Sequence, residues 1–516
     1  MQSFSPYDIK LQYNLVRLYA FRDEQRGLQD EIVTDIAEET EIVGHNTHDL
    51  CPTTNNCPIQ HLPVELLYLI FAESLWQVKY VWKYTTTPVT LKRVCRQWES
   101  IICGSPAFWK NLVLHHHPIQ ELEDVLGNYF RFGKLNRLDV DISLYGELNH
   151  TYPSERMEPL HVIRDNFQNI ESIVGHIHPT ALYELFGKEY IYDMRTIHTL
   201  MLRLKDPNYT NTSQASSFRC SDSFQLATVR TLDLYNFGYL LTNSNVKSAL
   251  PCLTRLFLKG DHPAYLLDHA VIFTILSVAV NLQELSWTPG QDLGEGLVGL
   301  HLAPIKLEKL TTMHVEFQPF SADPAAVVCA LQIPSLAECR FNGCNLSMTN
   351  HETYLYQMVE YFISSKGNCI RELALDNLLV TSEDWKRYIR FLPNLQKLST
   401  DGEVFADGFF QYLADDNLIG LTLPKLQCLT MVRRVFNNQE LDEFVRFAKN
   451  RGHVQKDHAQ LRTLQLACVS WGGPGRAEFQ RLSNEYANLD WGENVIDLKP
   501  VASPRALGTS DYTKCH

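Results

Sequence analysis

A short apolar phrase, Leu-x-x-Leu-x-Leu with substitutions, recurs along the chain from Leu135 to Leu466. Leucines two residues apart lie on the same face of a strand. Twelve copies, one of them weak, follow each other at intervals of 24 to 35 residues. Such a period is typical of solenoids. The copies begin at Leu135, Ile170 (the weak copy), Ile197, Val229, Leu253, Leu282, Leu310, Leu336, Ile370, Leu395, Leu426 and Leu461.

Between the phrases lie segments with a helical pattern, such as "LVTSEDWKRYIRFLPN", in which Ser382 can cap a helix. Strand plus helix, stacked about a dozen times, predicts an α/β fold of the leucine-rich-repeat type with a curved parallel sheet over residues 115–490. The Asn or Cys expected after the third leucine fits at Cys344, but stands one place early at Asn236 and Asn377. The alternative, a generic α/β domain with chance copies, is disfavoured by their number and even spacing.

Side chains alternate along a strand, so the residues beside the buried leucines should line the open face of the sheet. These residues are polar, aromatic and of both charge signs, which suits a protein epitope better than a polyanion. The candidate substrate-binding residues are Arg203, Asp233, Tyr235, Phe257, Lys259, Arg340, Asn342, Asp376 and Asp401.

The repeats are preceded by a compact helical pattern over residues 59–114. In "HLPVELLYLIF", Pro63 stands at a first helical position, where its missing N–H costs nothing. A threonine-rich gap follows, and Pro88 is expected to open a second helix that ends at Gly104. A third segment holds Pro106 and Trp109. One face of the first helix carries Leu62, Leu66, Leu69 and Ile70.

The two ends of the chain have simpler patterns. Residues 1–43 have apolar positions at helical spacing and predict one helix or a short coiled coil. Residues 44–58 are rich in Asn, Thr and Pro and indicate a linker. Residues 491–516 are interpreted as a C-terminal tail.

Composition narrows the function classes. Hydrophobic residues make up 45% and charged residues 20% of the 516, as in folded proteins. The net charge of −13, without a basic run, argues against a nucleic-acid or anionic-membrane binder. No apolar run is long enough for a membrane span, and we see no signal peptide. The 13 cysteines include no Cys-x-x-Cys pair, which favours reduced thiols in the cytosol or nucleus.

The sequence contains no nucleophile elbow, phosphate loop, dinucleotide-binding turn or zincin helix. Three consecutive histidines, His115–His117, lack acidic or Cys partners at ligand spacing and are interpreted as a surface turn rather than a zinc site. We therefore expect no enzyme activity, cofactor or metal.

The helical block resembles an F-box. The resemblance is carried in order by "LPVELLYLIF", "LKRVCRQWESI" and "SPAFWKNL", and a leucine-rich array is a usual companion. The N-terminal helix, the linker and the long Thr-rich gap are similar to F-box proteins of mushroom-type fungi. The gap between Phe71 and Leu91 is longer than in a minimal F-box, which leaves the start of the second helix open.

The resemblance implies that residues 59–114 dock on the Skp adaptor of a cullin–RING (SCF-type) ubiquitin ligase, while the repeats capture a protein substrate. Ile70, Phe71 and Trp109 are expected to support the block's own core. The implied adaptor-facing residues are Leu62, Pro63, Leu66, Leu67, Val94, Cys95 and Trp98.

Two other functions stay open. One is a scaffold that binds the adaptor but never joins a cullin. The other is a plain leucine-rich-repeat interaction protein with a degenerate F-box. Neither alternative predicts nucleic-acid or membrane binding.

Overall fold

The computed structural model describes residues 62–76, 81–114, 119–133, 137–142 and 158–177 and, with gaps, residues between 185 and 471. The N-terminal helix (1–43), the linker (44–58), the tail (491–516) and His115–His117 lie outside the described residues. The chain divides into two compact units, Met1–Ser74 and Leu75–His516.

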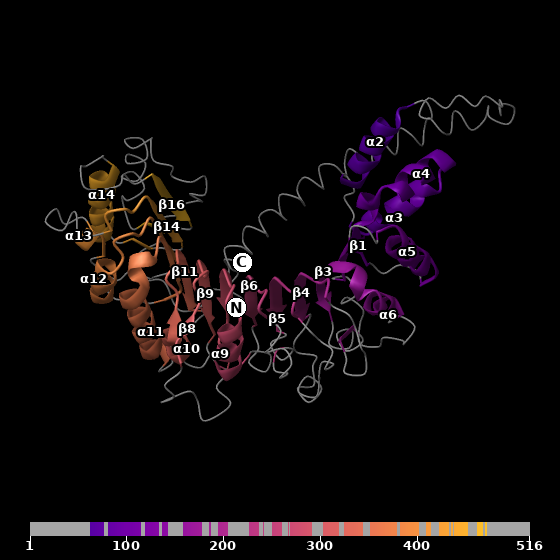
Figure 1. The fold of residues 1–516 in the computed structure, drawn as a ribbon. Coiled ribbons are helices and arrows are strands. Elements are labelled where there is room, and N and C mark those ends of the chain that lie inside the picture. The colour runs from indigo at the N-terminus through magenta and orange to yellow at the C-terminus, as the bar shows by residue number, and fades with distance from the viewer. Residues whose placement is uncertain are drawn as a thin grey trace, which may run out of the picture. The chain divides into compact units, whose positions relative to one another are not determined.

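The second unit is built on a 13-stranded parallel sheet, whose strands lie side by side in chain order (Figure 1). Each of the twelve leucine-rich phrases contributes one strand, so the predicted leucine-rich-repeat architecture is confirmed. The strands are β1 (Asn111–Val113), β2 (Leu138–Asp141), β3 (Ile170–Ile177), β4 (Thr199–Leu204), β5 (Thr231–Tyr235), β6 (Arg255–Lys259), β7 (Glu284–Trp287), β9 (Thr312–Phe317), β11 (Glu338–Gly343), β12 (Glu372–Asp376), β13 (Lys397–Asp401), β14 (Cys428–Val432) and β16 (Thr463–Ala467).

The second residues of strands β4 to β14 face each other in direct register and form one buried column across the sheet. Burial of this column removes a continuous apolar stripe from water, which is the main force that stacks the repeats. Its members are Leu200, Leu232, Leu256, Leu285, Met313, Cys339, Leu373, Leu398 and Leu429.

A repeated backbone contact holds each strand start in register. The N–H groups of Ala337 and Glu338 both donate to the carbonyl of Thr311 in the preceding repeat, at 2.8 and 2.9 Å. The same paired contact recurs from His198 to Gln427. It satisfies the backbone groups that lead into each strand.

Asparagine side chains strengthen this edge. Asn394 donates to the carbonyl of Asn368 in the previous repeat, and Lys425 of the next repeat donates to the Asn394 side-chain oxygen at 2.6 Å. Asn281 and Lys309 make the equivalent contacts earlier in the array. These side-chain hydrogen bonds lie just before the strands, at positions that the leucine-rich pattern does not single out.

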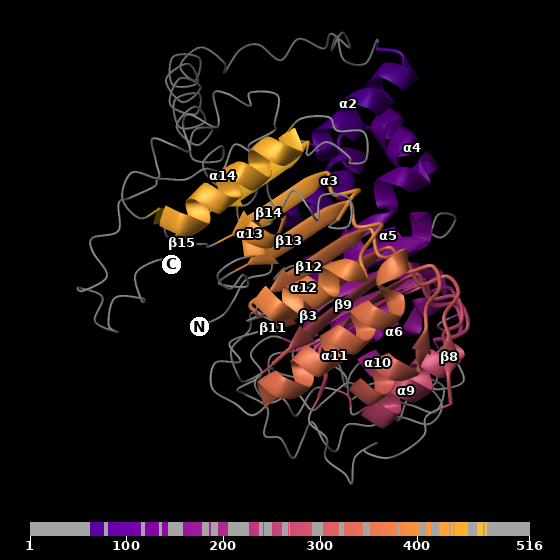
Figure 2. The same ribbon diagram turned by 90° about the vertical axis from the view of Figure 1, so that its left-hand side faces the viewer.

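Helices cover the buried face of the sheet (Figure 2). Aromatic contacts join the two layers: Phe341 of β11 meets Phe362 of α11 edge-on, with ring centroids 5.4 Å apart. The helices are α6 (Glu158–Asp165), α9 (His269–Val278), α10 (Ala325–Ala330), α11 (His351–Lys366), α12 (Ser382–Arg390), α13 (Phe409–Leu413) and α14 (Asn438–Gly452). Two short pairs, β8 (Ile305–Lys306) with β10 (Leu331–Gln332) and β15 (Val435–Phe436) with β17 (Ser470–Trp471), also lie outside the main sheet.

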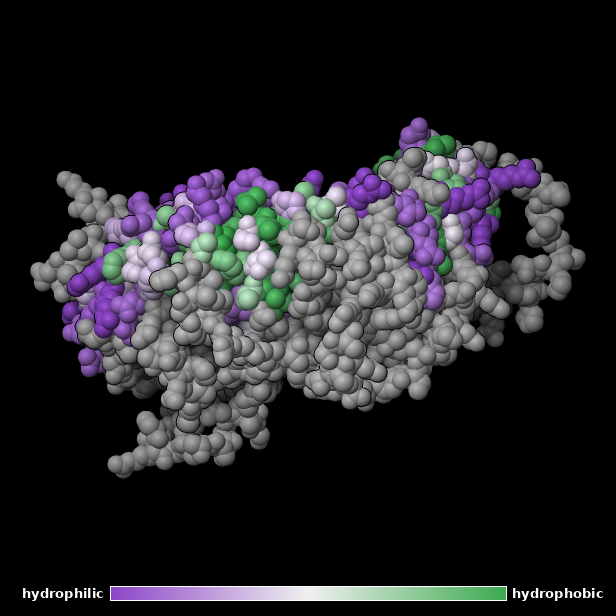
Figure 3. Space-filling view, turned by 60° about the horizontal axis from the view of Figure 1, so that its bottom comes forward, coloured by the Kyte–Doolittle hydropathy of each residue, from purple (hydrophilic) through white to green (hydrophobic). Residues whose placement is uncertain are grey.

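The apolar helix α9 is buried on one side. Val271, Ile272 and Ile275 lie in the core. Seen from below, hydrophobic surface gathers near the middle of the molecule, between more hydrophilic stretches (Figure 3). Val280, just beyond α9, is 52% exposed.

The helical block before the repeats differs from the expectation in one element. Residues expected to be a threonine-rich gap form helix α3 (Val81–Lys92), with Pro88 inside it rather than at a helix start. The next helix, α4, begins only at Arg96 and runs to Gly104. The first helix of the block, α2 (Val64–Trp76), follows Pro63, whose carbonyl accepts the N–H groups of Leu66 and Leu67.

Tertiary hydrogen bonds explain why α3 forms against local propensity. The buried Thr85 hydroxyl donates to the carbonyl of Val113 at 2.7 Å and accepts the N–H of the same residue at 2.9 Å. These bonds fix α3 to strand β1. The gain outweighs the weak helix preference of three threonines and the lost hydrogen bond at Pro88.

Trp109 closes the block as expected. It lies in the 3-10 helix Pro106–Trp109, is fully buried, and its indole N–H donates to the carbonyl of Ile102 at 2.8 Å. Its ring meets Tyr129 of α5 (Ile119–Phe132) edge-on at 5.3 Å. Trp109 therefore joins α4 to the first repeat.

Candidate functional site

Helix α2 carries apolar side chains on opposite faces. Leu67, Phe71 and Leu75, four residues apart, are at most 4% exposed. The outward face carries Leu66, Leu69 and Ile70, which are 46, 60 and 46% exposed, beside the exposed Glu73. Large apolar side chains that gather on the exposed face of a helix mark interaction sites. The open face of α2 is therefore a candidate docking surface.

Two expectations for α2 change. Ile70 was expected in the block's own core, but it is exposed, because the buried positions follow Leu67 at four-residue spacing and Ile70 falls beside Leu66. Leu67 was expected to face the adaptor, but it is fully buried. Pro63 is exposed and Leu62 half-buried.

The second group of expected adaptor residues lies at the break between α3 and α4. The N–H of Val94 donates to the carbonyl of Leu91 at 3.2 Å, which turns the chain and leaves Val94 56% exposed. Cys95 and Trp98 are half-buried. The turn thus presents one large apolar side chain outward.

The open face of the sheet is ordered in rows by the strand register. The first, third and fifth residues of strands β4 to β14 point away from the leucine column. Across β9, β11, β12 and β13, the fifth row runs through Glu316, Asn342, Asp376 and Asp401. Across β3, β4, β5 and β6, the row at the same level runs through His176, Arg203, Tyr235 and Lys259.

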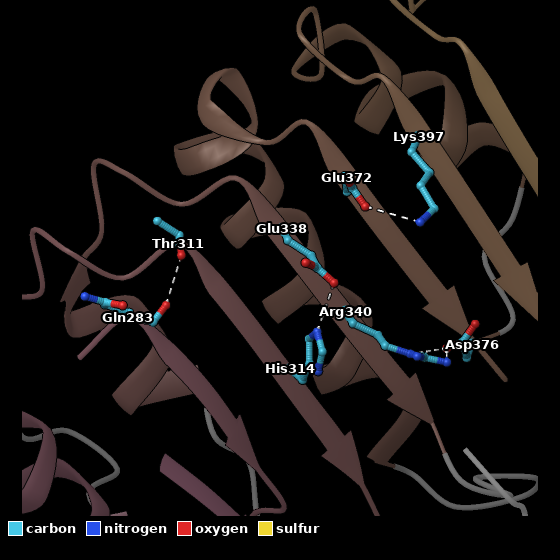
Figure 4. A network of polar contacts seen from close by, with 8 residues as sticks. All are labelled: Gln283, Thr311, His314, Glu338, Arg340, Glu372, Asp376 and Lys397. Atoms are coloured by element: carbon cyan, nitrogen blue, oxygen red, sulfur yellow. Dashed lines mark hydrogen bonds and ion pairs between the residues drawn. The ribbon is translucent and has the colours of Figure 1, made fainter. Parts of the chain in front are cut away.

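Several charged side chains on β9 to β13 form pairs across neighbouring strands (Figure 4). The Arg340 guanidinium binds the Asp376 carboxylate at 2.6 Å, and Asp376 is almost completely buried. Lys397 pairs with Glu372 at 3.3 Å. This half of the face is consequently a network of internal ion pairs.

A histidine belongs to the same network. His314 Nε2 lies 3.3 Å from Glu338 Oε1. This hydrogen bond lowers the pKa of Glu338, although burial acts in the opposite direction. Four residues of these pairs are not among the candidate substrate-binding residues predicted from the sequence, namely His314, Glu338, Glu372 and Lys397.

Charges on β4 to β6 are arranged differently. Burial raises the pKa of Asp233, while Arg203 and Lys259 on the flanking strands lower it. No ion pair within 4 Å joins these side chains in the part of the chain that the structure describes. Tyr235 and Phe257 are partly exposed beside them.

The structure therefore sorts the candidate substrate residues into two groups. Arg203, Asp233, Tyr235, Phe257 and Lys259 lie together on β4 to β6. The strands β7 and β9 separate them from the second group, and Ser286 of β7 and Thr288, just after β7, are buried.

The second group lies on β11 to β13. Asn342 accepts a hydrogen bond from Asn377 at 3.0 Å. Asp376 is occupied by Arg340. Asp401 stands opposite Asp376 in the register, and its side chain lies outside the described residues.

Other chemistry is sparse in the described residues. They contain no group of three or more His, Cys, Asp or Glu side chains that can hold a metal ion. The cysteines that the structure describes carry free thiols. Among the helices it describes, none combines the length and the apolar character needed to cross a membrane.

No known protein-family model matches this chain, and no curated protein matches it either. Among solved structures, it is similar to the leucine-rich repeat-containing protein LegL7 from Legionella pneumophila, with 14% identity and a TM-score of 0.30, over 57% of this chain and 90% of that one. This similarity is too low to carry a functional argument. The assignment to a leucine-rich-repeat solenoid therefore rests on the repeated phrases and on the parallel strands that they form.

Proposed function

We propose that this chain is the substrate-recognition subunit of a cullin–RING ubiquitin ligase of the SCF type. The helical block at residues 59–114 docks on a Skp-type adaptor, and the open face of the sheet holds a protein substrate. The observation that carries the proposal is the exposed apolar face of α2, within a segment whose sequence resembles an F-box.

The exposed side chains of α2 supply the binding energy. Leu66, Leu69 and Ile70 lie one turn or less apart, and each has about half of its surface in water. Burial of that surface by a partner contributes about 1 kcal/mol per side chain. Exposed apolar patches of this kind mark interaction sites in soluble proteins.

The chemistry is left to other subunits. In this proposal the chain supplies no catalytic residue, cofactor or metal, and ubiquitin transfer is performed by the RING subunit and its conjugating enzyme. The cullin joins through the adaptor, and the complex acts in the cytosol or the nucleus. Neither nucleic acid nor membrane takes part.

Co-purification tests the proposal. The full chain, expressed with a Skp-type adaptor, a cullin and a RING subunit, should elute with all three in size-exclusion chromatography. Elution with the adaptor but without the cullin would indicate a scaffold instead. Elution with neither would indicate a plain leucine-rich-repeat interaction protein.

A further inference from the structure

The strand register gathers basic and aromatic side chains at one end of the open face. Arg203, Tyr235 and Lys259 occupy directly opposed positions on β4, β5 and β6. Neighbouring strands lie about 4.8 Å apart, so the attachment points of Arg203 and Lys259 are about 10 Å apart. His176 on β3 extends the same row.

These cations differ from those elsewhere on the face. Arg340, Lys397 and Arg255 each pair with a carboxylate of a neighbouring strand. Arg203 and Lys259 lie on the strands that flank Asp233, and among the described residues no ion pair joins these three side chains. The described side chains of β4 to β6 therefore carry more positive than negative charge, in a chain whose total charge is −13.

Apolar surface accompanies the charge. Met201 and Phe257 stand on either side of Asp233 in the third row, and both are partly exposed. The patch ends at β6, because Ser286 of β7 and Thr288, just after β7, are buried. It is therefore a small area in which two cations frame apolar and aromatic side chains.

We propose that Arg203 and Lys259, together with Tyr235 and Phe257, bind an extended acidic peptide segment of a protein substrate. In a polyproline II conformation, side chains repeat every third residue, about 9 Å apart. A Glu-x-x-Glu segment then offers one carboxylate to each cation and an apolar side chain to Phe257. This inference deepens the proposed function, and rests on it in calling the bound protein a substrate.

Asp233 sets the selectivity of the patch. Its carboxylate repels an acidic ligand, so it limits affinity for segments whose carboxylates are not placed over Arg203 and Lys259. Removal of this charge should tighten binding of any acidic segment. A purely structural role for Asp233 would not produce that gain.

Fluorescence anisotropy on the full chain tests the assignment. The probe is a fluorescein-labelled peptide, Gly-Ser-Gly-Glu-Pro-Leu-Glu-Gly-Ser-Gly, with Gln and Lys versions in place of both Glu residues. We expect the Glu probe to bind at least tenfold more tightly than the Gln probe, and its affinity to fall with added salt. Equal affinity for the two probes would overturn the proposal.

Charge reversal locates the site. The double variant Arg203→Glu with Lys259→Glu should lose at least tenfold affinity for the Glu probe and should bind the Lys probe better than the unmodified chain does. An unchanged circular dichroism spectrum and urea midpoint show that the variant is folded. The matched control, Arg255→Glu with Lys397→Glu, changes net charge equally on the same face and should keep its affinity. Equal loss in both double variants would contradict the assignment.

Asp233→Asn provides the third readout. The affinity of this variant for the Glu probe should rise by about threefold, as expected for removal of one like charge at close range in a solvated site. Unchanged or weaker binding would place the peptide elsewhere. Adaptor binding is measured separately in each variant, so a failure of the peptide site and a failure of the proposed function give different results.

Discussion

Leu66 and Leu69 on the exposed face of α2 should contribute to adaptor binding but little to the stability of the fold. Both side chains are exposed, so their truncation should leave the free energy of unfolding within about 0.5 kcal/mol. The double variant Leu66→Ala with Leu69→Ala should weaken adaptor binding by about 2 kcal/mol, because a few central apolar anchors dominate interfaces. Isothermal titration calorimetry with purified adaptor measures the change.

Val280→Ala is the matched control for this prediction. Val280 is 52% exposed beyond α9, outside the helical block. Its truncation should not change adaptor affinity. If it weakens adaptor binding as much as the α2 variant does, the open face of α2 is not the docking surface.

Substitutions of Arg340 and Lys397 compare a buried ion pair with an exposed one on the open face of the sheet. Arg340→Ala leaves the Asp376 carboxylate buried without its cation, which should cost about 3 kcal/mol of unfolding free energy. Lys397→Ala breaks an exposed pair and should cost less than about 0.5 kcal/mol. Urea unfolding followed by circular dichroism measures both. Equal losses would show that the Arg340 pair is no more important than a surface pair.

The ion pair of Glu338 with His314 should make the free energy of unfolding depend on pH. Its pKa in the folded chain is lowered, first by the hydrogen bond with His314. The stabilisation is therefore complete above the usual Glu pKa of about 4.3 and is lost as the pH falls through the lower folded value. In Glu338→Gln, the urea midpoint should fall less between pH 5 and pH 3 than in the unmodified chain. Parallel pH profiles would contradict the contribution of this pair.

At the scale of elements, the strands were predictable and one helix was not. Leucines at period two mark each strand directly, since the same residues must point into the core. Helix α3 could not be predicted, because Thr85 is held by hydrogen bonds to Val113, distant in sequence. The face of α2 was predicted only in part: burial follows Leu67 and leaves Ile70 outside.

The dependence of α3 on β1 can be measured. Thr85→Val removes both hydrogen bonds and leaves the N–H and carbonyl of Val113 without that partner, which should cost about 2–3 kcal/mol. Thr90→Val, at an exposed position of the same helix, should cost less than about 0.5 kcal/mol. If the two substitutions have equal effects on the urea midpoint, tertiary contacts do not hold α3 in place.

At the scale of the whole molecule, the sequence predicted which residue types line the open face. It did not predict that they form two separate groups, one on β4 to β6 and one on β11 to β13. The alternation of side chains along a strand is enough to predict which residues lie on the open face. Which of them lie opposite each other on neighbouring strands depends on the strand register, which the sequence pattern does not give. That register comes from backbone bonds between repeats, such as those to Thr311. The pairing of Arg340 with Asp376, and the separate setting of Arg203 and Lys259, follow from it.

A solenoid transmits interactions mainly between neighbouring repeats. The exposed face of α2 shares no residue with the β4–β6 patch, which consists of Arg203, Asp233, Tyr235, Phe257 and Lys259. Substitutions at one of these sites should therefore not change binding at the other. We combine Leu66→Ala and Leu69→Ala with Arg203→Glu and Lys259→Glu in one variant. Its loss of adaptor affinity should equal that of the α2 double variant, and its loss of peptide affinity should equal that of the charge-reversed double variant, each within about 0.5 kcal/mol. A larger coupling would show that adaptor docking alters the substrate face, so that recognition and assembly are linked in this chain.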